Sequence, residues 1–327
     1  MNIVVTGATG FLGSHLVDRL CGRGDRVTCV IRAASSLRWL DRSPVELVTA
    51  GPDGKAGPGL RRALNEADYV YHLAGAIMGV AKEDYFRANA GGTRSLLQAM
   101  VDAGSRPKRF VYASTLAAVG PGSGESLINE DQEPRPGNWY GRSKLEAENI
   151  TRSYEKHFPH TIVRLPPVYG PRDRGMLQVF QSISKGIIGI LGRGNRTTFV
   201  YVSDFVRGVI LAAESPAGAG EIFTLGGREN LPAEDFCRRV ARAVGRKTFT
   251  LKIPMAAVYG AAAAAELAAR ARRSPTIFNW QKMGELKHDN WMVDISKART
   301  LLGYKPETGI ERGGKITYNW YLMKGWL

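Results

Sequence analysis

Tyr140 and Lys144 are the residue pair with the clearest capacity for acid–base chemistry in this sequence. They stand four residues apart in YGRSK, in a segment over 140–158 whose pattern predicts a helix, so they share a face. A free tyrosine has a pKa of about 10, and a nearby ammonium group favours its ionised form. The pair can therefore exchange a proton with a substrate hydroxyl or carbonyl. The alternative is an ordinary solvent-exposed pair on a helix.

Two hydroxyl groups end a second segment of chemical interest, YASTLAAVG. Ser114 and Thr115 lie at the carboxyl end of the strand expected over 108–115. A hydroxyl at this place can hold a substrate oxygen in line with the Tyr140 phenol. Serine and threonine are also common at ordinary strand ends, so this segment gains meaning only beside the others.

Three glycines near the amino terminus form a phosphate-binding pattern. TGATGFLG places Gly7, Gly10 and Gly13 directly after an expected strand and at the start of an expected helix. The first glycine permits a tight turn, the second lets the backbone approach a pyrophosphate, and the third lets helix and strand pack closely. The free N–H groups and the dipole of the helix start favour an anion. In this context the motif predicts a dinucleotide site.

Alternating strand and helix patterns supply the elements that must position these groups. Val- and Ile-rich runs, each followed by a helix, predict βαβ units and a doubly wound parallel α/β sheet of the Rossmann type. Ligands of such sheets bind outside the carboxyl ends of the strands, where every motif above lies. The expected strands are 2–6, 26–31, 45–48, 67–75, 108–115 and 160–165, with a strand and turn at 199–205, and the expected helices are 11–24, 82–103 and 140–158.

The pattern loosens after residue 165, which predicts a division into two domains. We expect a dinucleotide-binding Rossmann domain over 1–165, to which 199–225 returns. We expect a smaller, mainly C-terminal substrate-binding domain over 166–198 and 226–327.

The composition is that of an ordinary globular protein. The 327 residues are 44% hydrophobic and 23% charged, which suffices for a normal core without disulfide or metal staples. The three cysteines are far apart, so we expect free thiols, no metal site and a reducing, cytoplasmic location. The net charge of +15 attracts phosphates, but the basic residues are dispersed, so no nucleic-acid partner is expected.

The sequence predicts neither a signal peptide nor a membrane-spanning helix. The nearest candidate, the Ala-rich residues 255–275, is interrupted by Gly260 and Glu266 and ends in a basic cluster. Alanine is too weakly apolar to drive insertion, so a packed helix is expected there.

The order of seven segments resembles the extended short-chain dehydrogenase/reductase family. This family includes sugar-nucleotide epimerases and dehydratases, dihydroflavonol reductases and 3β-hydroxysteroid dehydrogenases. The resemblance covers nearly the whole chain, including WMVDISKARTLLGYKP. Each motif alone is common, but their joint occurrence is highly specific. The segments are TGATGFLG, YHLAG, Asn89 in NAGGT, YASTLAAVG, YGRSK, RLPPVYGP and FVYVSDF.

The resemblance implies roles for individual residues, together with hydride transfer at a nicotinamide, a small-molecule substrate and a homodimer. Thr115 matches the family's catalytic hydroxyl, and Tyr140 its general acid/base. Lys144 matches the lysine that lowers the tyrosine pKa and binds the nicotinamide ribose, and Asn89 matches an asparagine of the proton-relay region. The implied cofactor-binding residues are Gly7, Thr9, Gly10, Phe11, Leu12, Gly13, Leu73, Ala74, Tyr140, Lys144, Pro167 and Val168.

Some positions depart from the family's pattern. Leu116 and Ala117 stand where the family's dehydratases carry an Asp-Glu pair, so a 4,6-dehydratase is not expected. Thr197 stands where nucleotide-sugar epimerases usually carry a pyrophosphate-binding arginine. Arg172 and Arg196 are therefore weak candidates for substrate binding, beside Thr115. The further candidates are Arg174 and Arg193 for phosphate, Asp53 for the adenine amine, and the Ala-rich residues 255–271 for a less polar pocket or plain helix packing.

The segment VTCVIRAASS bears on the choice of dinucleotide. Ile31 replaces the acid that would hold a ribose 2′-hydroxyl, and Arg32 follows where NADPH-using reductases of the family carry an arginine. A guanidinium can grip a 2′-phosphate bidentately, and Ser35 adds a hydroxyl donor. We therefore expect NADP(H) to be favoured over NAD(H). Alternatively, Arg32 stacks on the adenine or faces solvent.

Three functions remain open from the sequence. The main expectation is a reductase or dehydrogenase that interconverts a secondary alcohol and a ketone with Tyr140 as general acid/base. The alternative is a nucleotide-sugar epimerase that uses the same Thr115, Tyr140 and Lys144 with transient oxidation of its substrate. A nucleotide-sensing regulator on a Rossmann scaffold is disfavoured, because such proteins tend to lose the tyrosine and lysine, and both are present here.

Overall fold

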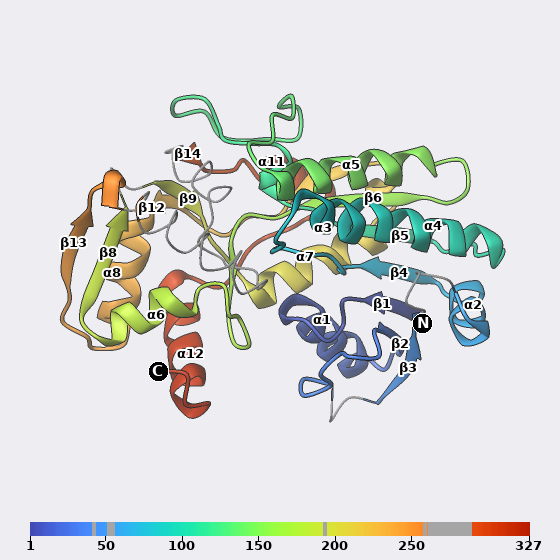
Figure 1. Cartoon of the computed structure of the whole chain (residues 1–327), viewed down its shortest axis with the longest axis horizontal. Coiled ribbons are helices and arrows are strands. Elements are labelled where there is room, and N and C mark those ends of the chain that lie inside the picture. Colours follow the sequence, from blue (N-terminus) through green and yellow to red (C-terminus); the bar gives the residue numbers. More distant parts are fainter. Residues whose placement is uncertain (41–43, 51–55, 192–194, 258–259, 261–289) are drawn as a thin grey trace.

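A seven-stranded parallel sheet organises the computed structural model, which describes residues 1–40, 44–50, 56–191, 195–257, 260 and 290–327 (Figure 1). Its strand order is β11-β6-β5-β4-β1-β2-β3, and every neighbouring pair is parallel. The doubly wound Rossmann architecture predicted from the sequence is thereby confirmed. The strands are β1 (Asn2–Thr6), β2 (Arg26–Ile31), β3 (Val45–Thr49), β4 (Tyr69–His72), β5 (Arg109–Ala113), β6 (His160–Arg164) and β11 (Ile222–Thr224).

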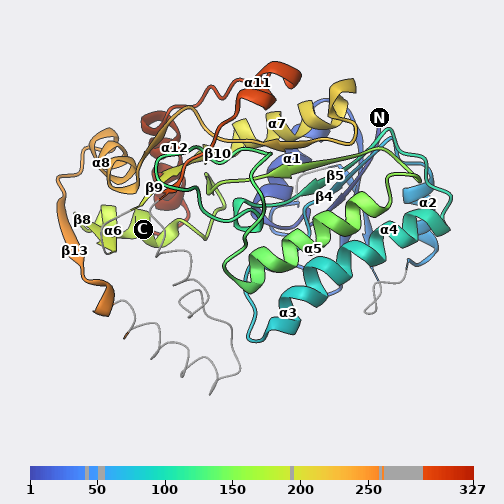
Figure 2. The same ribbon diagram turned by 90° about the horizontal axis from the view of Figure 1, so that it is seen from above.

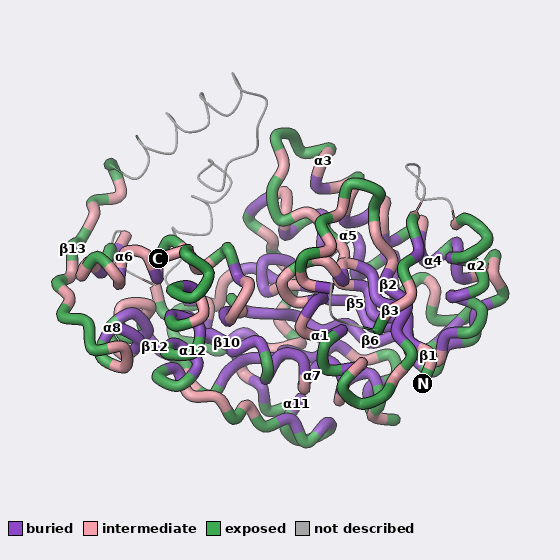
Figure 3. Tube along the Cα trace, turned by 90° about the horizontal axis from the view of Figure 1, so that it is seen from below, coloured by how far each residue is buried: buried purple, intermediate pink, exposed green. Residues whose placement is uncertain are grey.

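Helices cover both faces of this sheet (Figure 2). Successive side chains of a strand point to opposite faces, so Ile3 and Val5 enter one apolar core and Val4 enters the other. Because helices cover both faces, the inner strands are nearly continuous buried runs, as Figure 3 shows, whereas the edge strand β3 is mostly half-buried or exposed. One face carries α1 (Phe11–Gly22), α7 (Val202–Glu214) and α11 (Ser296–Leu302), and the other carries α2 (Pro58–Asn65), α4 (Gly92–Asp102) and α5 (Trp139–Ser153).

A second region follows β6, and its described residues form three small sheets. Its apolar side chains, among them Phe180, Phe236 and Tyr321, belong to the same core cluster as Ile3 and Val5. The described parts of the two regions therefore share one core, and the domain boundaries stay a prediction. The sheets pair β7 (Val168–Tyr169) with β10 (Val200–Tyr201), β8 (Ile187–Leu191) with β13 (Phe249–Ile253), and β9 (Arg196–Thr198) with β12 (Asn230–Pro232) and β14 (Asn290–Trp291). The helices are α6 (Leu177–Ser184), α8 (Ala233–Ala243) and α12 (Ile310–Met323).

Two predicted elements differ from those observed. The strand and turn expected at 199–205 reduce to the two-residue β10, because α7 already begins at Val202. Asp204 favours that early start: its carboxylate lies in the first turn and accepts the backbone N–H groups of Glu307 and Thr308 at 3.0 and 2.9 Å. The long helix expected over 82–103 is divided into α3 (Lys82–Phe86), a π-helical turn η1 (Arg87–Gly91) and α4.

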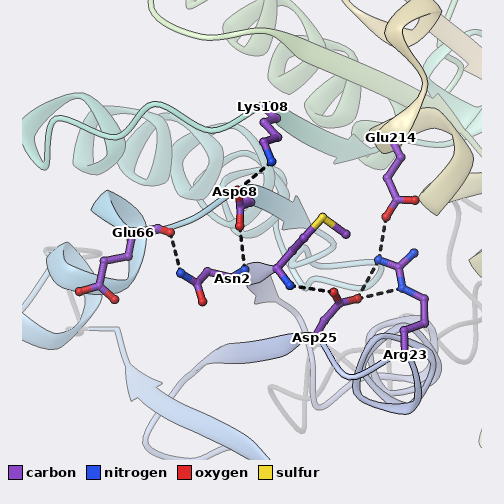
Figure 4. Close-up of polar contacts among 8 residues, drawn as sticks. Asn2, Arg23, Asp25, Glu66, Asp68, Lys108 and Glu214 are labelled. Carbon is purple, nitrogen blue, oxygen red and sulfur yellow. Dashed lines mark hydrogen bonds and ion pairs between the residues drawn. The ribbon is translucent and has the colours of Figure 1, made fainter.

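Ion pairs gather at the amino ends of the strands (Figure 4). Asp25 pairs with the terminal amine at 3.1 Å and with Arg23 at 2.7 Å, and Arg23 also pairs with Glu214 at 2.7 Å. Asp68 accepts the backbone N–H of Asn2 at 2.9 Å and pairs with Lys108 at 3.1 Å. We call these residues the amino-end cluster: Met1, Asn2, Arg23, Asp25, Glu66, Asp68, Lys108 and Glu214.

Within the part of the chain that the structure describes, no helix has the length and apolar character needed to cross a bilayer. Asp53, Arg193 and most of the Ala-rich residues 255–275 lie outside the described residues.

Candidate active site

The predicted phosphate-binding turn connects β1 to α1. Gly7 adopts φ +71°, and a Cβ there would lie 2.7 Å from the backbone nitrogen of Ala74, so only glycine fits without strain. The Gly10 N–H donates to the Gly7 carbonyl at 3.0 Å, and Gly13 lies directly against that carbonyl. Gly10 caps α1 and offers no side-chain acceptor, so the N–H groups of the first helical turn can meet an anion. The turn thus fits a dinucleotide pyrophosphate.

The remaining predicted cofactor residues of this edge lie around the same turn. Leu73 and Ala74 follow β4, and their backbone lies against Gly7. Thr9 precedes Gly10, while Phe11 and Leu12 form the first turn of α1, and all three are partly buried. Because β1 and β4 are parallel neighbours, both of their exit loops reach one edge of the sheet.

Thr115 and Tyr140 are brought together by a close backbone contact. Thr115 caps the short 3-10 helix η2 (Leu116–Ala118), with its Oγ1 accepting the Ala117 N–H at 3.2 Å. Asn138 caps α5 by accepting the Gly141 N–H at 2.7 Å. Gly141 lies so close to the Ala117 carbonyl that no side chain would fit between them. The first turn of α5, which carries Tyr140, therefore abuts the turn that follows Thr115.

Lys144 lies one helical turn below Tyr140 and is buried. Its ammonium donates to the Ala113 carbonyl at 2.5 Å and lies 4.2 Å from the centre of the Tyr112 ring. Burial lowers the pKa of Lys144 to about 7, although Glu148 opposes the change. Burial raises the pKa of Tyr112, and the charges of Tyr140 and Glu148 add to the increase.

Asn89 sits in the π-helical turn η1 and is fully engaged. Its Oδ1 accepts the Ala76 N–H at 2.8 Å, and its Nδ2 donates to the Ala76 carbonyl at 3.1 Å and to the Ser143 hydroxyl at 2.8 Å. Ser143 in turn donates to the Tyr140 carbonyl at 2.8 Å. Gly75 lies against both the Asn89 and Lys144 side chains. Asn89 therefore joins the loop after β4 to the helix that carries Tyr140 and Lys144.

A buried ion pair between Glu148 and Arg164 fixes α5, the helix that carries Tyr140 and Lys144, to the central sheet. Arg164, at the end of β6, binds Glu148 of α5 through two contacts, at 2.8 and 3.2 Å. Ser114, at the end of β5, donates to the same carboxylate at 2.5 Å. The Glu148 side chain is 0% exposed, so the charge has been removed from water and needs both partners. The pair fixes α5 relative to the strands that end beside Thr115.

Arg32 directly follows β2 and is exposed. Its N–H donates to the Ser35 hydroxyl at 3.1 Å, and the Ser35 N–H donates to the Arg32 carbonyl at 2.9 Å, which closes a tight turn. Arg38 lies over the Trp39 ring at 4.5 Å from its centre. The turn presents a guanidinium at the carboxyl end of β2, the position that the sequence assigned to a 2′-phosphate.

The two arginines predicted to bind substrate are ion-paired elsewhere. Arg172, with φ +73°, pairs with Asp18 of α1 at 2.8 Å and lies 5.5 Å from the centre of the Trp39 ring. Arg196 pairs with Glu125 at 2.7 Å. Substrate binding by either one stays a prediction.

The two residues predicted near the nicotinamide lie beside β10. Val168 begins β7, and the Pro167 carbonyl accepts the Val200 N–H at 3.0 Å.

Sequence reasoning missed the groups that hold the candidate catalytic residues in place: His72, Thr93, Ser143, Glu148 and Arg164. It considered Ser114 only for a substrate oxygen, whereas the Ser114 hydroxyl donates to Glu148. One signal was present, because Glu148 follows Lys144 by four residues and so lies on its face of α5. The partner Arg164 carries no such signal, since only the sheet brings β6 beside β5.

Comparison with known proteins agrees with this geometry. Residues 3–226 match the model of the NAD dependent epimerase/dehydratase family. The chain is 29% identical over 327 residues to a ceramide reductase of Caulobacter vibrioides, covering 99% of this chain and 96% of that protein. It is 28% identical over 346 residues to an uncharacterized UDP-glucose epimerase of Bacillus subtilis, covering 99% and 100%. UDP-glucuronic acid 4-epimerase of Bacillus cereus, solved with UDP-glucuronic acid and NAD, superposes with a TM-score of 0.77 at 26% identity, covering 99% and 100%.

Proposed function

The chain belongs to the NAD dependent epimerase/dehydratase family, within the extended short-chain dehydrogenases/reductases, and on that premise we propose that it transfers hydride between a nicotinamide dinucleotide and a secondary-alcohol carbon. The observation that carries the proposal is the buried Lys144 ammonium one turn from Tyr140, on a helix that abuts the Thr115 turn. The bound dinucleotide would supply the hydride acceptor or donor. The glycine turn of β1 and α1, with Leu73 and Ala74, would hold it.

The side chains of the site would manage the proton. In the oxidation direction, Tyr140 as phenolate takes the proton of the substrate hydroxyl, while the carbon bearing that hydroxyl gives up its hydride. Thr115 would hold the same oxygen by a hydrogen bond. Lys144 favours the phenolate while it is protonated, because an ammonium nearby stabilises the ionised tyrosine. In the reduction direction each transfer runs in reverse, and Tyr140 delivers its proton to the carbonyl oxygen.

Epimerisation of a nucleotide sugar is the first candidate for the net reaction. Its support comes from relatives, since the Bacillus cereus structure and the Bacillus subtilis protein are both named for UDP-sugar epimerisation. This reaction oxidises one carbinol carbon, turns the keto intermediate and returns the hydride to the other face. No net consumption of dinucleotide would accompany it.

Reduction of a ketone on an apolar molecule is the second candidate. The loop after Asn89's partner Ala76 exposes apolar side chains, with Ile77 67% and Val80 47% exposed. Leu116 and Ala117 place apolar groups directly after Thr115, and Arg172 and Arg196 are already ion-paired. The Caulobacter relative is named as a reductase of a lipid. These features favour a substrate without a diphosphate.

We propose NADP(H) as the favoured dinucleotide, because Arg32 is exposed at the end of β2 and no acid stands at Ile31. The solved relative named above holds NAD, so the preference rests on this turn alone. Arg32→Ala is expected to weaken NADPH binding about tenfold or more and NADH binding little, as measured by fluorescence titration. Equal losses for both dinucleotides would overturn the preference.

We also propose that 166–198 and 226–327 form the substrate-binding domain and that the chain forms a homodimer. Sedimentation equilibrium checks the second statement directly.

Substitution of the general acid/base tests the proposal as a whole. Tyr140→Phe is expected to lower turnover at least 100-fold on a panel of UDP-sugars and ketones, with dinucleotide binding retained. Tyr154→Phe is the matched control, because Tyr154 follows the same helix but bonds to Gln98 at the surface. Full turnover by Tyr140→Phe would overturn the mechanism. A changed sugar stereocentre without dinucleotide consumption identifies the epimerase, and steady NADPH consumption with a ketone identifies the reductase.

A further inference from the structure

We call the turn between β1 and α1 that carries Gly7 and Gly10 the cofactor turn. His72 lies next to it, at the centre of a buried chain of hydrogen bonds. It is the last residue of β4 and is 3% exposed. Its Nδ1 lies 2.6 Å from the Thr6 hydroxyl, at the end of β1, and its Nε2 lies 2.9 Å from the Thr93 hydroxyl, in α4. The ring lies beside those of Phe110 and Tyr112, with centres 6.0 and 5.7 Å away. Thr6 and Thr93 therefore hold both nitrogens.

The hydrogen bonds at the two ends of this chain of hydrogen bonds, at Thr93 and at Thr6, determine which atom carries each proton along it. The Thr93 hydroxyl donates to the Asn89 carbonyl at 2.7 Å, so it must accept the N–H from His72 Nε2. His72 Nδ1 then has no proton and accepts from the Thr6 hydroxyl. The Thr6 oxygen in turn accepts the Ala74 N–H at 3.2 Å. A single neutral tautomer of His72 satisfies all of these groups.

This hydrogen-bonded chain links two parts of the candidate site through buried side chains, beside the direct contact of Gly75 with the Asn89 and Lys144 side chains. At one end are Thr6 and Ala74, which flank the Gly7 turn. At the other end is Asn89, whose side chain holds Ala76 and, through Ser143, the Tyr140 backbone. The π-helical turn at Asn89 is a local distortion of the kind often found at functional sites. The Thr93 hydroxyl is the contact that ties this turn to His72.

We propose that His72 is a positioning residue which, as the neutral Nε2–H tautomer, couples the cofactor turn to Asn89 and so to the helix bearing Tyr140. The expected change in kcat rests on the proposed function. The expected changes in dinucleotide binding and in amide exchange at Ala76 do not depend on the reaction. Burial and the neighbouring Lys144 charge hold the pKa of His72 at about 3, so the ring adds no charge beside the ammonium at neutral pH. His72 therefore couples the two parts through the positions of its hydrogen bonds and not through a charge.

Two substitutions of His72 separate its hydrogen bond to Thr6 from its hydrogen bond to Thr93. His72→Asn places an amide near Nδ1, which keeps the Thr6 contact and loses the one to Thr93. His72→Gln places an amide near Nε2, which keeps the Thr93 contact and loses the one to Thr6. Thr93→Val should behave like the first and Thr6→Val like the second. His157→Asn and His157→Gln, at an exposed histidine, are the matched controls.

We expect the variants that lose the Thr6 contact and the variants that lose the Thr93 contact to have different defects. His72→Gln and Thr6→Val should raise the dissociation constant for dinucleotide about tenfold, with kcat within about threefold of the parent. His72→Asn and Thr93→Val should lower kcat about tenfold with dinucleotide binding nearly unchanged. Amide exchange at Ala76, whose N–H is held by Asn89, should accelerate only in the second pair. Nitrogen NMR of the parent should show one unprotonated Nδ1 between pH 6 and 8.

The outcomes distinguish this inference from the proposed function. Identical effects of Asn and Gln at residue 72 on binding and Ala76 exchange would overturn the coupling and leave a packing role. A histidine that titrates near its ordinary pKa, or carries its proton on Nδ1, would overturn the tautomer assignment. If no substrate is turned over by the parent, the proposed function fails, while dinucleotide binding and Ala76 exchange still decide the coupling.

Discussion

The two ends of the central sheet use the same kinds of residue under opposite conditions. At the amino end, most charges of the amino-end cluster of Figure 4 are partly exposed: the Lys108 side chain is 63% exposed and Glu214 32%, while Asp25 is 6% exposed. At the carboxyl end, Lys144, Glu148 and Arg164 are buried, as are His72 and Asn89. Solvated pairs gain little because water competes for both partners. Buried charges become expensive when a partner is lost, so each group at the carboxyl end is tied to a fixed neighbour.

This difference in solvation gives a physical reason for a candidate site at the carboxyl end only. A solvated cluster can hold strands together but leaves its side chains free to move. A desolvated cluster fixes its members and shifts their proton affinities, as Lys144 shows. The chemistry of proton exchange requires both effects.

The largest effect is expected from Glu148→Gln. This change leaves the Arg164 guanidinium buried without its counterion, at a cost of about 3–5 kcal/mol in the free energy of unfolding. Urea denaturation monitored by circular dichroism measures it. The double variant Glu148→Gln/Arg164→Met should recover much of the loss, because it removes both charges. A loss below about 1 kcal/mol would show that the buried pair behaves like one at the amino end.

A pH-dependent effect is expected from Lys144→Met. In the parent, burial lowers the Lys144 pKa from 10.5 to about 7, so between these values the unfolded chain binds a proton that the folded chain has released. The free energy of unfolding should therefore rise with pH in this window, by up to about 1.4 kcal/mol per unit. The difference between parent and Lys144→Met, from urea titrations at pH 7, 8 and 9, isolates this contribution. Lys108→Met is the control at the other end, because Asp68 raises the Lys108 pKa and no slope is expected below pH 10. Parallel curves for parent and Lys144→Met would contradict the prediction.

The smallest effect is expected from Arg23→Gln at the amino end. It removes the contacts with Asp25 and Glu214, which are worth about 0–1 kcal/mol because the guanidinium remains partly solvated. The same urea titration in 1 M salt should shrink the difference further, since salt screens exposed charges. A loss comparable with that of Glu148→Gln would erase the contrast between the ends.

The sequence predicted the parts of this molecule that depend on local pattern. Apolar runs located six strands of the central sheet but not the three-residue β11. Gly7, Gly10 and Gly13 marked the turn between β1 and α1, where Gly7 has a positive φ and Gly13 lies against the Gly7 carbonyl. Tyr140 and Lys144 were recognisable because helical spacing puts them on one face. The roles of these residues stay predictions that the variants above test.

Contacts across the sheet could not be predicted in the same way. Arg164 meets Glu148, and His72 meets Thr6 and Thr93, only because distant segments become neighbours in the fold. The ion pairs of Arg172 with Asp18 and Arg196 with Glu125 are also long-range, so no local pattern indicated these partners when both arginines were considered for substrate binding. Asp204, in the first turn of α7, accepts N–H groups from residues 307 and 308, which are far along the chain.

Strand β11, which pairs with β6, is synthesised long after β6, so β6 lacks this neighbour for part of the time that the chain is being translated. Strand β6 ends at Arg164, whereas its outer neighbour begins at Ile222, about 60 residues later along the nascent chain. At ~5–20 residues synthesised per second, β6 remains an open edge for roughly 3–12 s. An unpaired strand edge is a template for pairing with other chains. During synthesis, therefore, the strand that carries Arg164 is the place where crowded nascent copies can mispair, before Ile222–Thr224 emerges to cover it.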